Sequence, residues 1–123
     1  MTDYSASRPA VVVDLKKDRI RIHKNTIHAI GAPDYILLLV NPETRTLAIV
    51  RSNRYHPRAF PLSTASSSNN TLELYSRSLV KSLSALCMDW RKYQSYRLYG
   101  EIILNRGIAR FYMSEAVPVN GGE

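Results

Sequence analysis

Short runs in which apolar and polar residues alternate dominate this chain, and they predict strands joined by brief turns. The segment DRIRIH (18–23) places its isoleucines on one face and its arginines and histidine on the other, which is the period of a half-buried strand. The β-branched run 10–15 and the apolar run 35–40 predict two further strands. A proline-containing turn over 41–46 would join the last of these to a partner strand at 47–51.

Two segments instead space their apolar residues as helices do. The segment 24–30 predicts a helix of two turns that faces Ile27 and Ile30 inward. The segment 76–88 predicts a longer amphipathic helix, and Ser76 is a residue type that commonly caps the first turn.

The second half of the chain follows the same order of elements as the first. Residues 71–75 alternate again before the longer helix, and 95–104 and 108–113 then predict a hairpin. Gly107, in the turn NRG, suits the left-handed backbone that such a turn needs. The polar run STASSSNN (63–70) separates the two halves and reads as a linker.

Equivalent positions of the two halves match at a spacing of 52 residues, as Ile20 does with Leu72 and Ile22 with Leu74. We therefore expect an α+β fold of two strand–helix–hairpin repeats in a pseudo-two-fold arrangement, with mostly antiparallel sheet and one longer helix. The alternative is coincidence, because this order of elements is common. The expected organisation is a flexible N-terminus (1–9), one domain (10–113) built from half-repeats 10–62 and 71–113 joined by the linker 63–70, and a flexible tail (114–123).

Composition supports a single globular domain. The chain has 123 residues, of which 45% are apolar, which is enough to build an independent core. Its longest apolar run, 36–40, is far shorter than the roughly 20 residues that a membrane-spanning helix needs. The first residues do not resemble a secretion signal, and the single Cys87 permits no intrachain disulfide. We therefore expect a cytoplasmic protein without a membrane partner.

Positive charge is concentrated in the first half of the chain. The net charge is +7, with twelve arginines against five lysines. Residues 1–62 hold ten Lys or Arg and five Asp or Glu, whereas residues 63–123 hold seven and five. No acid lies between Glu43 and Glu73, although four arginines do. Arginine matters here because its planar fork can hold phosphate through two hydrogen bonds.

The stretch RSNRYHPR (51–58) is the leading candidate for a binding site. Its arginines would neutralise phosphates, while its tyrosine and histidine would stack on a base or meet a sugar. Loops that a sheet holds in place commonly carry such contacts. The alternative is a solvated basic loop without a ligand. The candidate residues are Arg51, Arg54, Tyr55, His56 and Arg58.

The stretch WRKYQSYR (90–97) is the second candidate, because aromatic and basic residues interleave along it. Its rings would serve as stacking platforms and its cations would meet a nucleic-acid backbone. The alternative places Trp90 over the helix–sheet core and the tyrosines on a half-exposed edge. The residues assigned to binding are Arg91, Lys92 and Tyr93. A third basic stretch, KKDRIRIHK (16–24), is expected to form one solvent-facing strand surface through Lys16, Lys17, Arg19 and Arg21.

Signals of catalysis are weak. The spacing of His23, His28 and His56 is not that of metal ligands, and no glycine-rich phosphate loop occurs. Cys87 lies in an apolar helical stretch and is expected to be a buried small hydrophobe. We therefore expect no enzymatic activity, no metal and no cofactor.

The stretch RIRIHKNTIHAIGAPDYILLLVNPETRTLAI resembles a family of small uncharacterised proteins encoded on integrative elements and prophages of gut bacteria. That similarity extends over most of 10–113 and implies a mobile-element context. The order of strand, short helix and strand in the quoted stretch is also similar to that of the AbrB and MraZ transcription regulators. This second resemblance implies DNA binding by analogy.

Together these observations predict a small, basic, non-enzymatic protein that binds nucleic acid, in a regulatory role associated with a mobile element. The alternative is a protein-interaction or oligomeric assembly module without nucleic-acid binding. In that case exposed strand edges at YILLLV (35–40) or IARFYM (108–113) would pair between copies of the chain.

Overall fold

The computed structural model describes residues 8–119. Most of the expected flexible N-terminus (1–9) and the last four residues of the expected tail (114–123) lie outside the described residues. Within 8–119, no helix has the length and apolar character needed to cross a membrane.

Strands are the main regular structure of the described chain. In chain order they are β1 (Ala10–Asp14), β2 (Arg19–His23), β3 (Tyr35–Asn41), β4 (Thr46–Ser52), β5 (Phe60–Pro61), β6 (Ser66–Ser68), β7 (Thr71–Tyr75), β8 (Ser95–Ile103), β9 (Ile108–Tyr112) and β10 (Val117–Val119). The helices are α1 (Lys24–Ala29) and α2 (Arg77–Ala85), with single 3-10 turns at η2 (Leu62–Thr64) and η3 (Met113–Glu115). The segments expected to be a linker and a tail therefore contain β6 and β10.

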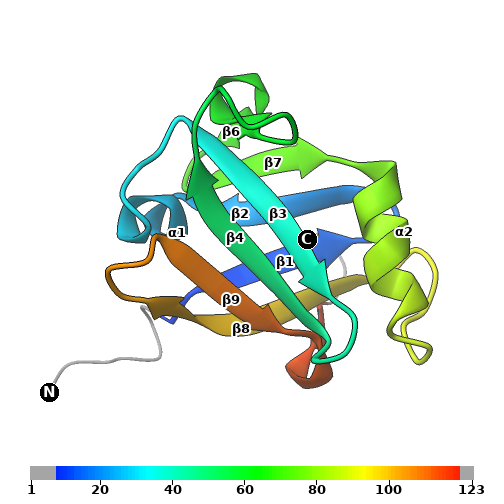
Figure 1. The fold of residues 1–123 in the computed structure, drawn as a ribbon. Helices are drawn as coiled ribbons and strands as arrows, with labels where there is room; N and C mark the ends of the chain where they lie inside the picture. Colours follow the sequence, from blue (N-terminus) through cyan, green and yellow to red (C-terminus); the bar gives the residue numbers. More distant parts are fainter. Residues whose placement is uncertain (1–7, 120–123) are drawn as a thin grey trace, which may run out of the picture.

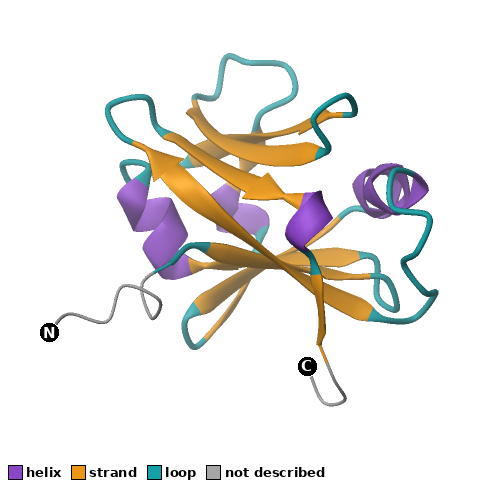
Figure 2. Cartoon of the chain, turned by 90° about the horizontal axis from the view of Figure 1, so that it is seen from below, coloured by secondary structure: helices purple, strands orange, loops and turns teal. Residues whose placement is uncertain are grey.

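All ten strands belong to one antiparallel sheet, in the order β5-β3-β4-β9-β8-β1-β2-β7-β6, with β10 also paired to β8. In Figure 1 the strands β3, β4 and β9 cross in front of β1, β2 and β7, so the sheet folds back over itself as a half-barrel. Figure 2 shows the same two layers from below.

Strand β8 connects the two layers. Its first five residues, Ser95–Tyr99, pair with β1 in the back layer, and its last four, Gly100–Ile103, pair with β9 in the front layer. The strand changes layer at Gly100. A Cβ atom there would lie 2.0 Å from the carbonyl oxygen of Arg110, so only glycine allows β9 to approach so closely.

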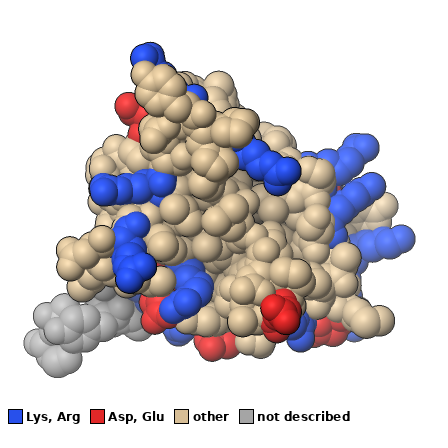
Figure 3. Space-filling model, viewed as in Figure 1, with Lys and Arg blue, Asp and Glu red and all other residues tan. Residues whose placement is uncertain are grey.

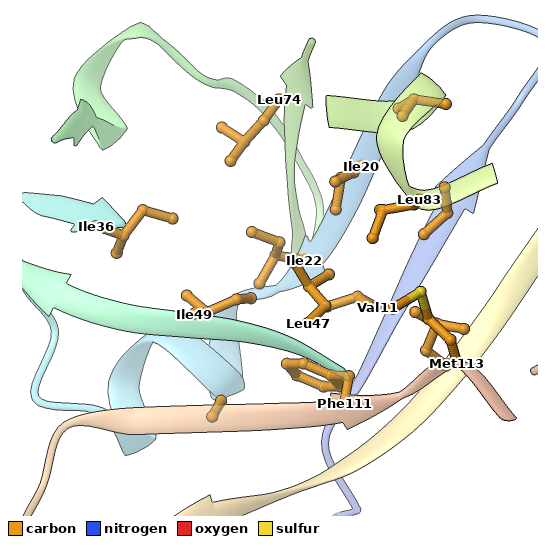
Figure 4. Packing of buried hydrophobic residues seen from close by; sticks show 14 of the residues in the cluster. Val11, Ile20, Ile22, Ile36, Leu47, Ile49, Leu74, Leu83, Phe111 and Met113 are labelled. Carbon is orange, nitrogen blue, oxygen red and sulfur yellow. The ribbon is translucent and has the colours of Figure 1, made fainter. Parts of the chain in front are cut away.

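The core fills the space between the layers. Figure 4 shows side chains from the back strands, such as Ile20 and Ile22, opposite Ile49 and Phe111 from the front strands. All four are 0% exposed. The two-residue alternation read from the sequence explains this placement, since it directs one face of each strand inward.

The two helices cover opposite ends of this core (Figure 1). Helix α1 contributes Ile27 and Ile30, as predicted, and α2 contributes Val80 and Leu83. The hydroxyl of Ser76 accepts a hydrogen bond from the backbone N–H of Leu79 at 3.3 Å, which confirms the predicted cap. Helix α2 is nevertheless shorter than the predicted 76–88: it begins at Arg77 and ends at Ala85.

The predicted α+β fold of two packed strand–helix–hairpin repeats is wrong. A single curled sheet runs through both halves of the chain, and β2 and β7, the predicted equivalent strands of the two repeats, are neighbours in it. The helices have six and nine residues, which is too short to form a layer of their own. Local patterning identified most strands but could not show that the sheet folds back over itself.

Candidate nucleic-acid interface

The segment 51–58, called the arginine loop below, follows the end of β4 and lies at the top of the molecule in Figure 1. Its arginines, Tyr55 and His56 are all exposed, Tyr55 to 77%. The guanidinium carbon of Arg54 lies 4.9 Å from the centre of the Tyr55 ring, and the same guanidinium donates a 2.9 Å hydrogen bond to the Tyr55 hydroxyl. The ring nitrogen Nδ1 of His56 accepts the backbone N–H of Arg58 at 3.1 Å. The loop therefore presents a guanidinium–tyrosine pair to solvent.

Two glycines leave room for the side chain of Arg51. A Cβ atom on Gly31 would lie 2.9 Å from Nη1 of Arg51, and one on Gly107 would lie 2.5 Å from its Cδ. Both glycines have left-handed backbones, with φ of 104° and 64°. The backbone N–H of Arg51 also donates to the carbonyl of Gly107 at 2.9 Å. The stem of Arg51 thus lies between the end of α1 and the β8–β9 turn, which limits the positions of its guanidinium.

The arginines of the arginine loop have no acidic partner within residues 8–119, a property that they share with Arg45, Arg91, Arg97 and Arg106. Within residues 8–119, ion pairs join Arg8 to Glu115, Arg19 to Asp14 and Glu73, Arg21 to Glu73, Arg77 to Asp18, and Arg110 to Glu101. None of these pairs involves the three arginines of the loop or Arg106, which stands next to Gly107 in the neighbouring turn. We call Arg51, Arg54, Arg58 and Arg106 the arginine surface.

The third basic stretch does not form the expected solvent-facing surface. Arg19 is only 8% exposed, and its Nε lies 2.9 Å from Asp14 while its Nη1 lies 3.1 Å from Glu73. Arg21 shares Glu73, with its Nε at 3.4 Å. Alternation placed both arginines correctly on the face away from the core, but carboxylates on the neighbouring strands bind them there. Lys16 and Lys17 alone are exposed.

The second candidate stretch combines an ordered part with an exposed part. The rings of Trp90 and Tyr96 are stacked, with centroids 4.6 Å apart and planes within 8°. The backbone N–H of Arg91 donates to the Tyr96 hydroxyl at 2.7 Å. The side chains of Arg91, Lys92 and Tyr93 are exposed, Tyr93 to 76%. Trp90 packs against the core, as its alternative interpretation predicted.

The two candidate stretches lie apart. In Figure 1 the arginine loop is at the top, whereas the loop 86–94 is at the lower right, beyond α2. Figure 3 shows Lys and Arg over α2 at the right edge, around α1 and the start of β9 at the left, and at the top, where an acidic side chain lies close to them. The predicted site residues therefore form two separate groups.

Sequence reasoning missed Arg106 and Arg45. Arg106 follows a hairpin strand, and only the pairing of Val50 with Ile108 brings its turn beside Arg51. Arg45 lies in the β3–β4 turn with a φ of 54°, and its side chain reaches the neighbourhood of Cys87. A single arginine in a hairpin turn gives no indication in the sequence of which distant residues it will lie beside.

Titratable side chains show little sign of catalytic arrangement. Burial raises the pKa of the Cys87 thiol, and the nearby Arg45 only partly offsets this, so the thiol stays protonated as expected of a buried hydrophobe. Hydrogen bonds from Tyr112 and then from Arg110 lower the pKa of Glu101 on the outer face of the front layer. Within residues 8–119, no group of three or more His, Cys, Asp and Glu residues is arranged to hold a metal ion.

Comparisons with known proteins add no relative. No protein-family model, no curated protein and no solved structure matches this chain. The two resemblances noted in the sequence therefore stay predictions.

Proposed function

We propose that this protein binds nucleic acid through the arginine surface, with single strands preferred over duplex. The observation that carries the proposal is that the arginine loop and the β8–β9 turn, which meet where the backbone N–H of Arg51 donates to Gly107, hold four exposed arginines with no acidic partner within residues 8–119, whereas five of the other eight arginines are paired. A regulatory role associated with a mobile element, the absence of enzymatic activity and a cytoplasmic location are parts of the same proposal that rest on the sequence alone.

Unpaired guanidinium groups favour phosphate as a ligand. A guanidinium donates two parallel hydrogen bonds to a phosphate, and these bonds are stronger than those between neutral groups. Holding Arg51 between Gly31 and Gly107 reduces the conformational entropy that its side chain would lose on binding. The exposed ring of Tyr55 adds a stacking surface that an unpaired base can reach, which is why single strands are preferred.

The triple variant R51Q/R54Q/R58Q tests this proposal. Fluorescence anisotropy of labelled single strands at several salt concentrations gives the slope of log affinity against log salt. We expect each neutralised phosphate of a single strand to contribute about −0.7 to this slope, so the variant should reduce its magnitude by about 2. The labelled duplex should bind more weakly than the single strand at every salt concentration.

The variant K16Q/K17Q/K81Q is the matched control. It removes the same three charges from exposed positions at the α2 end of the molecule, far from the arginine surface. We expect it to keep the wild-type slope. If both variants reduce the slope equally, binding depends only on the net charge of the protein. That result would contradict a defined binding surface. A wild-type protein that fails to bind either nucleic acid even at low salt would remove the proposal.

Self-association through β3 is the second candidate function. Strand β5 pairs only with the first two residues of β3, so residues 37–41 have no partner strand on that side within 8–119. Leu39, in this open segment, is 49% exposed. Open apolar edges can pair with the same edge of a second copy. The other predicted edge, at 108–113, is wrong, because β9 is paired with both β4 and β8.

The variant L39K tests self-association. A lysine on an open strand edge opposes pairing between copies. If β3 mediates a dimer, light scattering should give twice the monomer mass for the wild type and the monomer mass for L39K. The variant L104K, which changes a 78% exposed leucine in the β8–β9 turn, should stay dimeric. Because copies of a +7 protein repel each other, the dimer should strengthen as salt increases, opposite to nucleic-acid binding. A wild-type monomer at all salt and protein concentrations would exclude this function.

A further inference from the structure

A cavity of 760 Å³ opens between the β3–β4 turn, the loop 86–94 and the segment from η3 to β10. Its walls include Arg45, Trp90, Arg91 and Asp89. This volume lies within the range of about 300–1,000 Å³ that is usual for small-molecule sites. The cavity is separate from the arginine surface, because none of the four arginines of that surface lines it.

One wall of the cavity is ordered before any ligand binds. Trp90 stacks on Tyr96, and the Tyr96 hydroxyl accepts the backbone N–H of Arg91 at 2.7 Å. The side-chain amide of Gln94 donates to the carbonyl of Val119 at 2.7 Å, which joins this loop to β10. A ligand would therefore meet a preformed aromatic wall and would not have to order it.

Two arginines from different elements contribute positive charge to the same cavity. Arg45 comes from the β3–β4 turn, and its buried Nε has no hydrogen-bond partner within residues 8–119. Arg91 comes from the loop 86–94 and is exposed. Neither belongs to an ion pair within the described part of the chain. With the carboxylate of Asp89, these side chains give the lining a net charge of +1 (two cations less one anion).

We propose that this cavity binds a nucleoside monophosphate. The two guanidinium groups would hold the phosphate, since each can donate two hydrogen bonds to it. The base would pack on the half-buried Trp90, and Asp89 would accept hydrogen bonds from sugar hydroxyls or an exocyclic amine. The same chemistry is present in a free mononucleotide and at the 5′-phosphorylated end of a strand. The inference does not depend on the proposed function of the arginine surface.

The fluorescence of Trp90 measures binding directly, because it is the only tryptophan in the chain. We expect AMP to quench this fluorescence saturably, and adenosine and inorganic phosphate each to require at least a ten-fold higher concentration. The variants R45Q and R91Q should each weaken AMP binding about ten-fold or more, because each removes a hydrogen bond to a charged group. The control K92Q, which changes an exposed cation of the same loop that does not line this cavity, should change the affinity less than two-fold.

Oligonucleotides with and without a 5′-phosphate then identify the source of the nucleotide. Displacement of AMP by the phosphorylated strand alone supports a strand end as the ligand, and failure of both strands to displace AMP supports a free mononucleotide. These measurements are also made on R51Q/R54Q/R58Q, which should still bind AMP, so failure of one proposal is distinguishable from failure of the other. An absence of quenching together with no AMP retained in equilibrium dialysis would overturn the inference. So would AMP binding that neither R45Q nor R91Q weakens, or inorganic phosphate that binds as tightly as AMP, since that marks an adventitious ion only.

Discussion

Replacement of Arg19 by methionine is expected to lower the free energy of unfolding by about 3–5 kcal/mol, because it leaves the buried carboxylate of Asp14 without its cation. Asp14 is 3% exposed and lies 2.9 Å from Nε of Arg19, while Glu73 lies 3.1 Å from its Nη1. Burial alone would lower the pKa of Arg19, but Asp14, Tyr75 and Glu73 together raise it above its usual value. Arg19 therefore stays charged in the fold, and methionine replaces its stem but not its charge. Urea unfolding of R19M and wild type at neutral pH measures the difference.

The surface pair of Arg77 and Asp18 provides the control. Its side chains are 76% and 33% exposed and lie 3.4 Å apart, so R77M should cost less than about 1 kcal/mol. A loss of similar size in R19M and R77M would show that the pair of Arg19 with its carboxylates contributes no more than a solvated ion pair. That result would contradict the claim that burial makes the Arg19 ion pair more costly to break.

The network around Arg19 also shows how far alternation along a strand can predict an environment. The sequence correctly placed Arg19 and Arg21 on the face opposite Ile20 and Ile22. It could not show that Glu73, 52 residues beyond Arg21, lies directly across from it in the register of β2 and β7. Solvent exposure depends on such long-range partners. The prediction of a solvated basic surface was therefore wrong, although the arginines do lie on the predicted face of the strand.

The same distinction applies to the candidate sites. Composition was sufficient to predict that the arginine loop is basic and exposed, because both properties belong to the segment itself. The contact of Arg51 with Gly31 and Gly107 requires the curl of the sheet, which brings the end of α1 and the β8–β9 turn to the same strand end. Arg45 likewise meets the loop 86–94 only because the front layer crosses the back layer. Helical and strand periods contain no information about that crossing.

Replacement of Gly100 by alanine is expected to lower the free energy of unfolding by at least about 3 kcal/mol, the upper end of the usual cost of overpacking, because the obstacle is backbone. The new Cβ would lie 2.0 Å from the carbonyl oxygen of Arg110 and 2.7 Å from Cδ1 of Phe111. A flexible side chain could rotate away, but the Arg110 carbonyl belongs to β9, which is paired with β4 and β8. The clash can be relieved only by separating β8 from β9 where the sheet changes layer. Urea unfolding monitored by Trp90 fluorescence measures the loss.

The variant G107A separates this effect from the general cost of changing glycine to alanine. Gly107 belongs to the same hairpin and has a φ of 64°, but a Cβ there meets the Arg51 side chain, which can move. We expect G107A to cost about 1–2 kcal/mol for its left-handed backbone and to remain folded. If G100A does not fold at all, circular dichroism of the two variants side by side still distinguishes them, because only G107A should keep the wild-type spectrum. Equal stability of G100A and G107A would contradict this prediction. It would show that β8 and β9 can move apart at Gly100 without loss of the half-barrel.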